Sequence, residues 1–495
     1  MDHYGILSLL PPLIAIILAI KTRQVYLSLL LGIWSGWLIL NNGNLVSGSI
    51  ASIESLVDVL KDSGSARTII FSLLIGALLS LVQRSGGVEG FIKIVYSLLE
   101  KQKTKRESTR KSIIQISAVV TGALIFVETN ISVLTTGSIF RPVFDKYKIA
   151  REKLAYIIDS TSAPICILIP FNAWGAYIIS LLALQGIESP FRMLFSSYIF
   201  NLYPIFAIVL LLYLSRSGKD FGAMKKAMLR VEKEGKILPD GARPMISNDI
   251  TAIRKKDNIT PKASNMLIPI LTMVLMMPII LIYTGWQSLE NVESLSFFEK
   301  LLEALSNGSG SMAVLLSVTG AILVAMLTYK LRKIISFREM TDLSLKGMGG
   351  LVPLAFLMLL AFAIGTLCKE LGTGIYIAEI SKDFLSPKYL PAIIFVTSSI
   401  VAFSTGTSWG TFAIMLAIAI PLSQSLGMNP GILIGAVLSG GVFGDHCSPI
   451  SDTTIVSSMA SACDHIEHVK TQIPYALTAG FISLLFYLLL GFIYS

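Results

Sequence analysis

The chain has 495 residues, of which 53% are hydrophobic and only 14% are charged, and its mean hydropathy is +0.72. A soluble protein of this length needs more charged side chains to cover its surface, so the composition excludes a soluble globular domain. Apolar runs of about 17–25 residues, the length that crosses a bilayer core, recur along the chain. The sequence therefore predicts a polytopic, all-α membrane protein.

The net charge is +9, but the basic residues are concentrated in short segments between the apolar runs. Cytoplasmic loops of membrane proteins carry such an excess of Lys and Arg. The charge is therefore interpreted as a topology signal, with the lipid bilayer as partner and no nucleic acid. The four cysteines form no CxxC pair, and no Walker A, GxSxG or dinucleotide-binding motif is found. We expect neither an enzyme nor a bound cofactor.

Residues 1–215 are predicted to form a first membrane half that contains a re-entrant helical hairpin near residues 112–140. The basic loops at 101–111 and 141–153 are both expected to be cytoplasmic, yet only about thirty residues separate them. Two full spans need about 40 residues, so a hairpin fits this segment better. Its tip has polar residues that are tolerated at membrane depth only where they line a cavity, namely Glu128, Thr129 and Asn130.

A second polar cluster follows the hairpin inside apolar sequence. Residues 159–164 read DSTSAP, so an intramembrane carboxylate precedes three hydroxyls and a proline. The candidate ion-binding residues here are Asp159, Ser160, Thr161 and Ser162. Slightly further along, PFNAWG supplies Asn172 and Trp174, which are candidate contacts for an organic solute.

The most polar segment, residues 216–262, holds twelve Lys and Arg against six Asp and Glu. It is interpreted as a basic cytoplasmic linker between two membrane halves, and a regulatory surface is the alternative. The second half, residues 263–495, has a matching layout. A break near residues 401–409 (VAFSTGTSW) predicts a second hairpin near 391–409, with the candidate residues Ser404, Thr405, Thr407 and Ser408.

The stretch 440–454 reads GGVFGDHCSPISDTT and again places carboxylates among hydroxyls in apolar sequence. Its candidate residues are Asp445, His446, Ser448, Asp452 and Thr453. Each half thus carries a polar hairpin tip and then an Asp followed by Ser or Thr and Pro. Paired interruptions in corresponding halves indicate the binding site of a transporter built from two inverted repeats. The alternative is that small residues at both breaks only serve helix packing.

A carboxylate at the bilayer centre costs about 2.5–3.5 kcal/mol, so Glu128, Asp159, Asp445 and Asp452 require partners or a function. Hydroxyl and carbonyl oxygens suit an alkali cation better than a transition metal, and sodium is the only metal expected. Burial also favours the protonated form of a carboxyl group. Asp159 and Asp445 are therefore candidates to exchange sodium for protons. His446 either carries a proton or is a structural partner, and residues 464–468 (DHIEH) are interpreted as a solvated interfacial segment.

GGVFGDHCSPISDTT closely resembles the GDxCSPISDT-like signature of the NhaC-type sodium/proton antiporter family, and residues 141–164 resemble that family's first-half motif. The resemblance covers about residues 111–475. It implies a secondary transporter of the prokaryotic cytoplasmic (inner) membrane. It also implies the ion-transporter-superfamily fold, with inverted repeats and re-entrant hairpins, and a homodimer that works by an elevator-like motion.

The hairpin tip departs from the family pattern. Many relatives have an acidic pair there (FxDDYxN), whereas this chain reads FVETN with one carboxylate. Some members of the family are assigned organic-acid exchange or amino-acid transport. Sodium- or proton-coupled transport of a small organic acid or amino acid is therefore the alternative to sodium/proton exchange. A passive channel is a third reading, although a channel does not require two halves with matching carboxylates.

Overall fold

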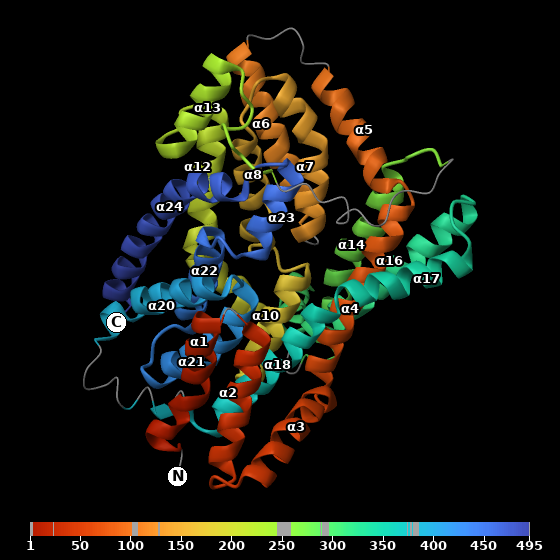
Figure 1. Ribbon diagram of the computed structural model, residues 1–495. Coiled ribbons are helices and arrows are strands. Elements are labelled where there is room, and N and C mark those ends of the chain that lie inside the picture. Colours follow the sequence, from red (N-terminus) through yellow and green to blue (C-terminus); the bar gives the residue numbers. More distant parts are fainter. Residues whose placement is uncertain are drawn as a thin grey trace.

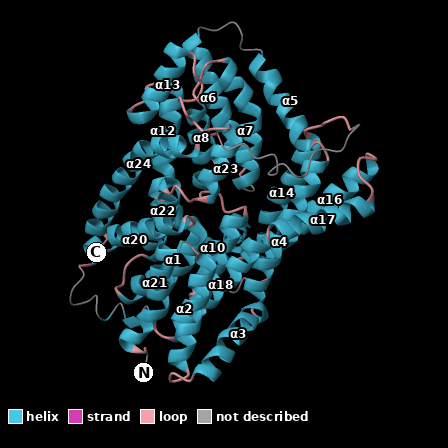
Figure 2. Ribbon diagram, viewed as in Figure 1, coloured by secondary structure: helices cyan, strands magenta, loops and turns pink. Residues whose placement is uncertain are grey.

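In the structure, a computed structural model, every regular element among the described residues is a helix (Figures 1 and 2). Within the described part of the chain, eight helices are long and apolar enough to cross a membrane, or nine if one bent pair counts as a span. The predicted polytopic all-α architecture is thus confirmed. The described residues are 3–22, 24–100, 107–126, 129–244, 259–287, 289, 297–373, 375–376, 379 and 386–494.

The first half of the chain begins with a short 3-10 helix and two apolar helices and ends with α12. Its elements are η1 (Gly5–Leu9), α1 (Leu10–Thr22), α2 (Val25–Leu40), α3 (Leu45–Lys61), α4 (Ser63–Arg84), α5 (Gly87–Glu100), α6 (Glu107–Leu124), α7 (Thr129–Lys146), α8 (Arg151–Ser160), α9 (Ala163–Cys166), α10 (Ala173–Leu184), α11 (Pro190–Ser197), η2 (Tyr198–Phe200) and α12 (Leu202–Ser217).

The predicted linker contributes one helix, and the second half contributes ten helices and one 3-10 turn among the described residues. These elements are α13 (Gly222–Glu234), α14 (Ser264–Trp286), α15 (Phe297–Asn307), α16 (Gly310–Leu331), α17 (Phe337–Gly350), α18 (Val352–Glu370), η3 (Pro387–Tyr389), α20 (Leu390–Thr405), α21 (Ser408–Ser425), α22 (Pro430–Cys447), α23 (Asp452–Ser461) and α24 (His465–Ile493).

The helices gather into two groups. Helices α6, α7, α8, α13 and α23 pack at one end of the molecule, and α1, α2, α10, α18 and α21 pack at the other (Figure 1). Helix α22 lies between the two groups and packs along α20 and α21. The polar segments singled out in the sequence lie where these groups meet.

Several spanning helices present apolar side chains outward, as a surface in contact with lipid requires. On α14 and α24 the exposed residues recur at every fourth position, which places them on one face of each helix. They are Leu271, Leu275, Ile279 and Tyr283 on α14, and Leu477, Phe481, Leu485 and Leu489 on α24. This exposed apolar area accounts for the low charge content of the chain.

Both predicted hairpin regions consist of two consecutive helices joined by a short break. In the first, α6 and α7 pack together, and Ser132 Oγ on α7 donates a hydrogen bond to the carbonyl oxygen of Gly122 on α6 (2.9 Å). In the second, α20 ends at Gly406, whose φ of +67° favours glycine, and α21 starts at Ser408. Helix α21 continues to Ser425, well beyond the predicted hairpin region near 391–409.

The first part of the predicted linker folds onto the first half through two ion pairs. The Nζ of Lys153 on α8 lies 2.6 Å from Asp220 Oδ1, and both side chains are at most 4% exposed. Arg230 on α13 donates to both oxygens of the buried Glu152, at 2.8 and 3.1 Å. Because buried charges require compensation, these contacts fix α13 against the start of α8.

A close helix–helix contact between α7 and α23 gives the first testable prediction. A Cβ added at Gly137 would lie 2.6 Å from the Cβ of Ala460, so Gly137→Leu overpacks this contact. We expect its free energy of unfolding to fall by about 1–3 kcal/mol, measured by thermal unfolding in detergent. Gly349→Leu is the matched control, because Gly349 is exposed and has open space around it. Equal stability of the two variants would contradict the close packing.

The ion pair between Lys153 and Asp220 gives the second prediction. Asp220→Asn leaves the buried Lys153 ammonium uncompensated, and we expect a loss of about 3–5 kcal/mol in the free energy of unfolding. Lys153→Met combined with Asp220→Asn removes both charges and is expected to recover most of that loss. The same thermal unfolding assay measures both proteins, and an equal loss in the single and double variants would argue against the pair.

Candidate functional site

The polar motifs singled out in the sequence are breaks in two long helices. In the first half, α8 ends at Ser160, the short α9 follows, and α10 starts after Asn172. The Asn172 side chain caps α10 by accepting from Gly175 N–H (3.1 Å) and donates to the carbonyl of Cys166 (2.9 Å). In the second half, α22 and α23 are bent by 46° at the break, where Ser451 caps α23.

The carboxylate of Asp159 on α8 is fully buried and is held by side chains from α23 and α24. Gln472 Nε2 donates to Asp159 Oδ2 at 2.6 Å, and Thr454 Oγ1 donates to the same oxygen at 3.2 Å. Ser457 Oγ donates to Oδ1 at 3.4 Å. A buried carboxylate requires such donors. The contacts therefore join the first polar motif to helices that lie about 300 residues away in the sequence.

His446 lies beside Asp159 and links three further elements. Its Nε2 is 3.7 Å from Asp159 Oδ2 and 3.3 Å from Ser160 Oγ, and its Nδ1 is 2.7 Å from the Tyr203 hydroxyl on α12. Gln472 Nε2 also donates to the backbone carbonyl of His446 (2.7 Å). Contacts with both ring nitrogens thus fix the orientation of the imidazole.

Asp445, the residue before His446, contacts the second hairpin instead. It is 2% exposed, and its Oδ2 accepts a hydrogen bond from Ser408 Oγ at the start of α21 (2.7 Å). Among the residues that the structure describes, none is a hydrogen-bond partner of its Oδ1. Consecutive residues on a helix point in different directions, so α22 directs its carboxylate toward the second hairpin and its imidazole toward Asp159.

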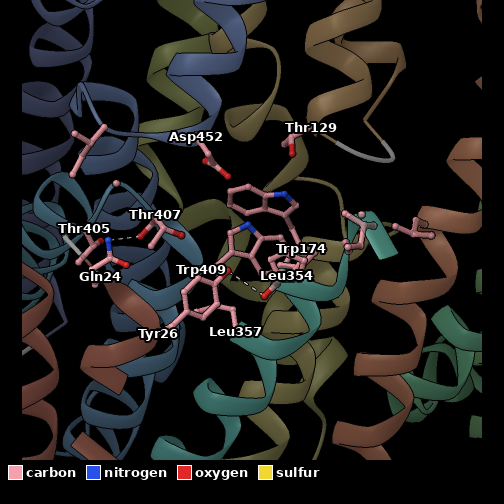
Figure 3. A pocket seen from close by; sticks show the side chains of 17 residues that line it. Gln24, Tyr26, Thr129, Trp174, Leu354, Leu357, Thr405, Thr407, Trp409 and Asp452 are labelled. Atoms are coloured by element: carbon pink, nitrogen blue, oxygen red, sulfur yellow. Dashed lines mark hydrogen bonds between the residues drawn. The ribbon is translucent and has the colours of Figure 1, made fainter. Parts of the chain in front are cut away.

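A cavity of about 350 Å³ lies between the two hairpin regions and the two breaks (Figure 3). Four helices begin at its wall: α7 at Thr129, α10 at Ala173, α21 just after Thr407, and α23 at Asp452. The indole rings of Trp174 and Trp409 line it side by side, with centroids 5.1 Å apart. Gln24, Tyr26, Leu354 and Leu357 also line it.

The wall of this cavity carries charge of both signs. Among the described residues that line it, Asp452 is the one charged side chain. The starts of helices carry partial positive charge from their unsatisfied N–H groups. The wall therefore combines one carboxylate, several positive helix ends and two aromatic faces, a combination that can accept both charges of a small polar solute.

The predicted residues fall into three groups. Thr129, Trp174, Thr405, Thr407 and Asp452 line the cavity, and Asp159, Ser160, Asp445, His446 and Ser408 form the contacts of the two buried carboxylates. The third group makes hydrogen bonds near its own position in the chain or across the breaks: Thr161 with Ile157 O, Ser162 with Asp159 O, Asn172 with Phe126 O, Ser448 with Phe403 O, and Thr453 with Ser451 Oγ.

Three further predicted residues stand outside these groups. Glu128 lies outside the described residues, and so does the side chain of Asn130. Ser404 is half-buried on α20 and does not line the cavity. Asn172 uses its side chain as a helix cap, so its contact with a solute stays a prediction.

The interpretation of residues 464–468 as a solvated segment is wrong for His468, which is fully buried. Its Nδ1 lies 2.9 Å from Ser458 Oγ on α23 and its Nε2 lies 3.0 Å from Gln472 Oε1. Asp464 lies at the surface, as expected, and caps α24. Partial burial raises its pKa, but hydrogen bonds from the backbone N–H groups of Arg243, Glu467 and Ile466 outweigh burial and lower it.

The residues that sequence reasoning missed are the partners of Asp159. Gln472 directly follows the polar stretch 464–471 (DHIEHVKT), so it did not stand out as a polar residue inside an apolar run. Thr454, Ser457 and the His446 partner Tyr203 carried no signal either, because hydroxyl groups are common in membrane helices and usually bond to their own backbone.

Residues 165–492 match the model of the Na+/H+ antiporter family. The chain belongs to this family. It is 32% identical to an uncharacterized protein of Haemophilus influenzae over 99% of this chain and 91% of that protein. A malate-2H(+)/Na(+)-lactate antiporter of Bacillus subtilis is 33% identical over 23% of this chain and 24% of that protein. The match to the family model confirms the resemblance seen in the sequence. The family consists of secondary transporters, so the chain is not an enzyme.

The fold is similar to that of the YdaH transporter of Alcanivorax borkumensis, with a TM-score of 0.55, 11% identity and 90% of each chain covered. At this identity the likeness concerns the fold alone. It supports the multi-span helical architecture of a transporter and carries no information about the solute.

The donors to Asp159 give the third prediction. Gln472→Leu and Thr454→Val each remove one donor to the carboxylate, while Ser461→Ala removes a buried hydroxyl of α23 that bonds only to its own helix. Hydrogen bonds to charged groups contribute about 1.5–3 kcal/mol, so we expect Gln472→Leu to lower the transport rate about 10- to 100-fold. Solute-dependent flux in proteoliposomes measures the rate. Ser461→Ala should keep wild-type flux, and an equal loss in this control would remove the assigned role of the Asp159 donors.

Proposed function

We propose that this protein exchanges sodium ions for protons across the prokaryotic cytoplasmic membrane, with Asp159 and Asp445 as the ion- and proton-binding carboxylates. The observation that carries the proposal is Asp445, a buried carboxylate with one oxygen bonded to Ser408 and one oxygen without a partner among the residues that the structure describes. A buried polar atom without a partner requires an explanation. A proton or a sodium ion on Oδ1 supplies one.

The two ions compete for the same group, and competition is sufficient for antiport. A proton and a sodium ion each neutralise the carboxylate, and a neutral site crosses an apolar barrier at lower cost than a charged one. Hydroxyl oxygens of Ser408, Thr454 and Ser457 lie against the carboxylates, and such oxygens suit sodium. His446 is placed to exchange a proton with Asp159, which is 3.7 Å from its Nε2.

Reciprocal contacts between the halves support two inverted repeats with re-entrant hairpins. Helix α7 of the first hairpin packs against α23, which follows the break of the second half, at Gly137 and Ala460. Helix α21 of the second hairpin packs against α10, which follows the break of the first half, where the Tyr177 hydroxyl donates to the carbonyl of Trp409 (3.0 Å). On this proposal residues 1–215 and 263–495 are the two membrane halves, joined by the linker 216–262.

The cavity favours a second candidate function, sodium- or proton-coupled transport of a small organic acid or amino acid. Its volume of about 350 Å³ is in the range of small-molecule sites and exceeds the needs of a bare sodium ion. Helix starts favour a carboxylate group, whereas Asp452 and the indole face of Trp174 favour an ammonium group. The malate–lactate antiporter named above is a relative that carries organic acids.

The fourth prediction separates these functions in proteoliposomes that hold a pH gradient. Sodium, lithium and potassium are added alone, and then a panel of organic acids and amino acids follows. Collapse of the gradient by sodium alone supports antiport, whereas a requirement for an organic solute supports the second function.

Two variants make the test specific. Asp445→Asn is expected to lower sodium-dependent proton flux at least about 100-fold, since a group that must bind both ions is removed. Asp58→Asn is the control, because Asp58 is exposed on α3 and paired only with Lys61. If ion flux down a gradient persists after both Asp159 and Asp445 are changed to Asn, the protein conducts passively and both proposed functions are wrong.

A further inference from the structure

A second, larger cavity of about 790 Å³ lies at the other end of α6 from the hairpin tip. The first half of α6, the end of α12 and the face of α13 that carries Lys225, Met228, Leu229 and Glu232 form its walls, and these helices are neighbours in Figure 1. Residues 107–111 at the start of α6 and the start of 216–262 belong to the basic segments that the positive-inside rule assigns to the cytoplasm. The cavity is therefore placed at the cytoplasmic ends of α6 and α12.

The walls of this cavity carry an excess of positive charge. Lys111 on α6, Arg216 and Lys219 at the end of α12, and Lys225 on α13 all line it, so three separate elements direct cations to one space. Two carboxylates also line it. The carboxylate of Asp220 is already bonded to the buried Lys153 and to the Tyr475 hydroxyl, and the second carboxylate is that of Glu232 on α13.

A buried amide at the inner wall indicates a ligand. Gln115 on α6 is 2% exposed and lines the cavity, and its Oε1 has no hydrogen-bond partner within the described part of the chain. A buried carbonyl oxygen of this kind requires a donor. A hydroxyl-bearing headgroup that enters between the cations supplies that donor.

The outer surface of α12 connects this cavity to the lipid. Val209, Leu212 and Tyr213 are exposed, and Arg216 follows at the spacing that places all four on one face of the helix. An apolar stripe therefore leads along the span to a cation at the cavity wall. A soluble phosphate compound has no apolar part that would contact that stripe, whereas the acyl chains of a lipid pack against it.

We propose that this cavity binds the headgroup of an anionic phospholipid. The phosphate lies among Lys111, Arg216, Lys219 and Lys225, a headgroup hydroxyl donates to Gln115, and the acyl chains follow α12. Basic pockets between membrane helices on the cytoplasmic side recognise anionic headgroups in this way. Because α13 forms one wall and is paired to α8 through Arg230 and Glu152, the bound lipid holds the linker in place against the helix that carries Asp159.

Thermal unfolding of the delipidated full-length protein in detergent tests the proposal. The midpoint is measured while phosphatidylglycerol, phosphatidylcholine, glycerol 3-phosphate or inorganic phosphate is titrated. Ligands that bind the folded state raise the midpoint with concentration. We expect phosphatidylglycerol to raise it and the other three to leave it unchanged at matched concentrations. A rise with glycerol 3-phosphate or phosphate equal to that with phosphatidylglycerol would overturn the lipid assignment.

Two charge pairs on the same segment provide the matched comparison. Lys219→Gln/Lys225→Gln removes two cations of the cavity, whereas Lys226→Gln/Lys233→Gln removes two exposed cations of α13 that do not line it. Each cation near a bound headgroup contributes about fivefold in affinity, so the first variant should require about 25-fold more phosphatidylglycerol for half of the full shift. The second should respond as the wild type does. An equal response of both variants means that the lipid acts through overall surface charge, and the site is then rejected.

Discussion

The burial of two carboxylates within an apolar helical assembly is the constraint on which the arrangement of the other elements depends. A charge removed from water must be compensated by donors, and donors must come from backbone breaks or from polar side chains. Asp159 obtains its donors from α23 and α24, and Asp445 obtains one from the start of α21. Helices from both halves of the chain must therefore meet at the breaks, and the central cavity lies where they meet.

The two carboxylates are held differently. Asp159 accepts three hydrogen bonds and lies beside an imidazole. Asp445 accepts one, and its other oxygen has no hydrogen-bond partner among the described residues. Asp445 and His446 are adjacent on α22. A proton or ion that binds to one of them therefore acts on the same helix that positions the other. Helix α22 thus links the second hairpin to the Asp159 contacts through a single rigid element.

The sequence predicts the positions of the breaks well because helix interruption is a local property. Pro164 lies in the first turn of α9, Pro449 lies between α22 and α23, and Gly406 ends α20, positions where proline and glycine are favoured, and polar residues near these breaks line the cavity. The contacts between the two halves could not be predicted in this way. The pairing of Asp159 with Gln472 joins residues 313 positions apart, and no periodicity or spacing encodes such a contact. The burial of His468 was missed for the same reason, because its partners lie on α23 and on the next turn of α24.

The aromatic wall of the cavity has a consequence for how the molecule can be observed. The chain contains five tryptophans, and two of them, Trp174 and Trp409, line the cavity with ring centroids 5.1 Å apart. Indole emission depends on the polarity and charge around the ring. Trp174 comes from the break of the first half and Trp409 from the second hairpin, so a change in their separation registers relative movement of these two elements. Tryptophan emission is therefore expected to report movement of these two elements relative to each other, and Trp34, Trp37 and Trp286 contribute the background signal.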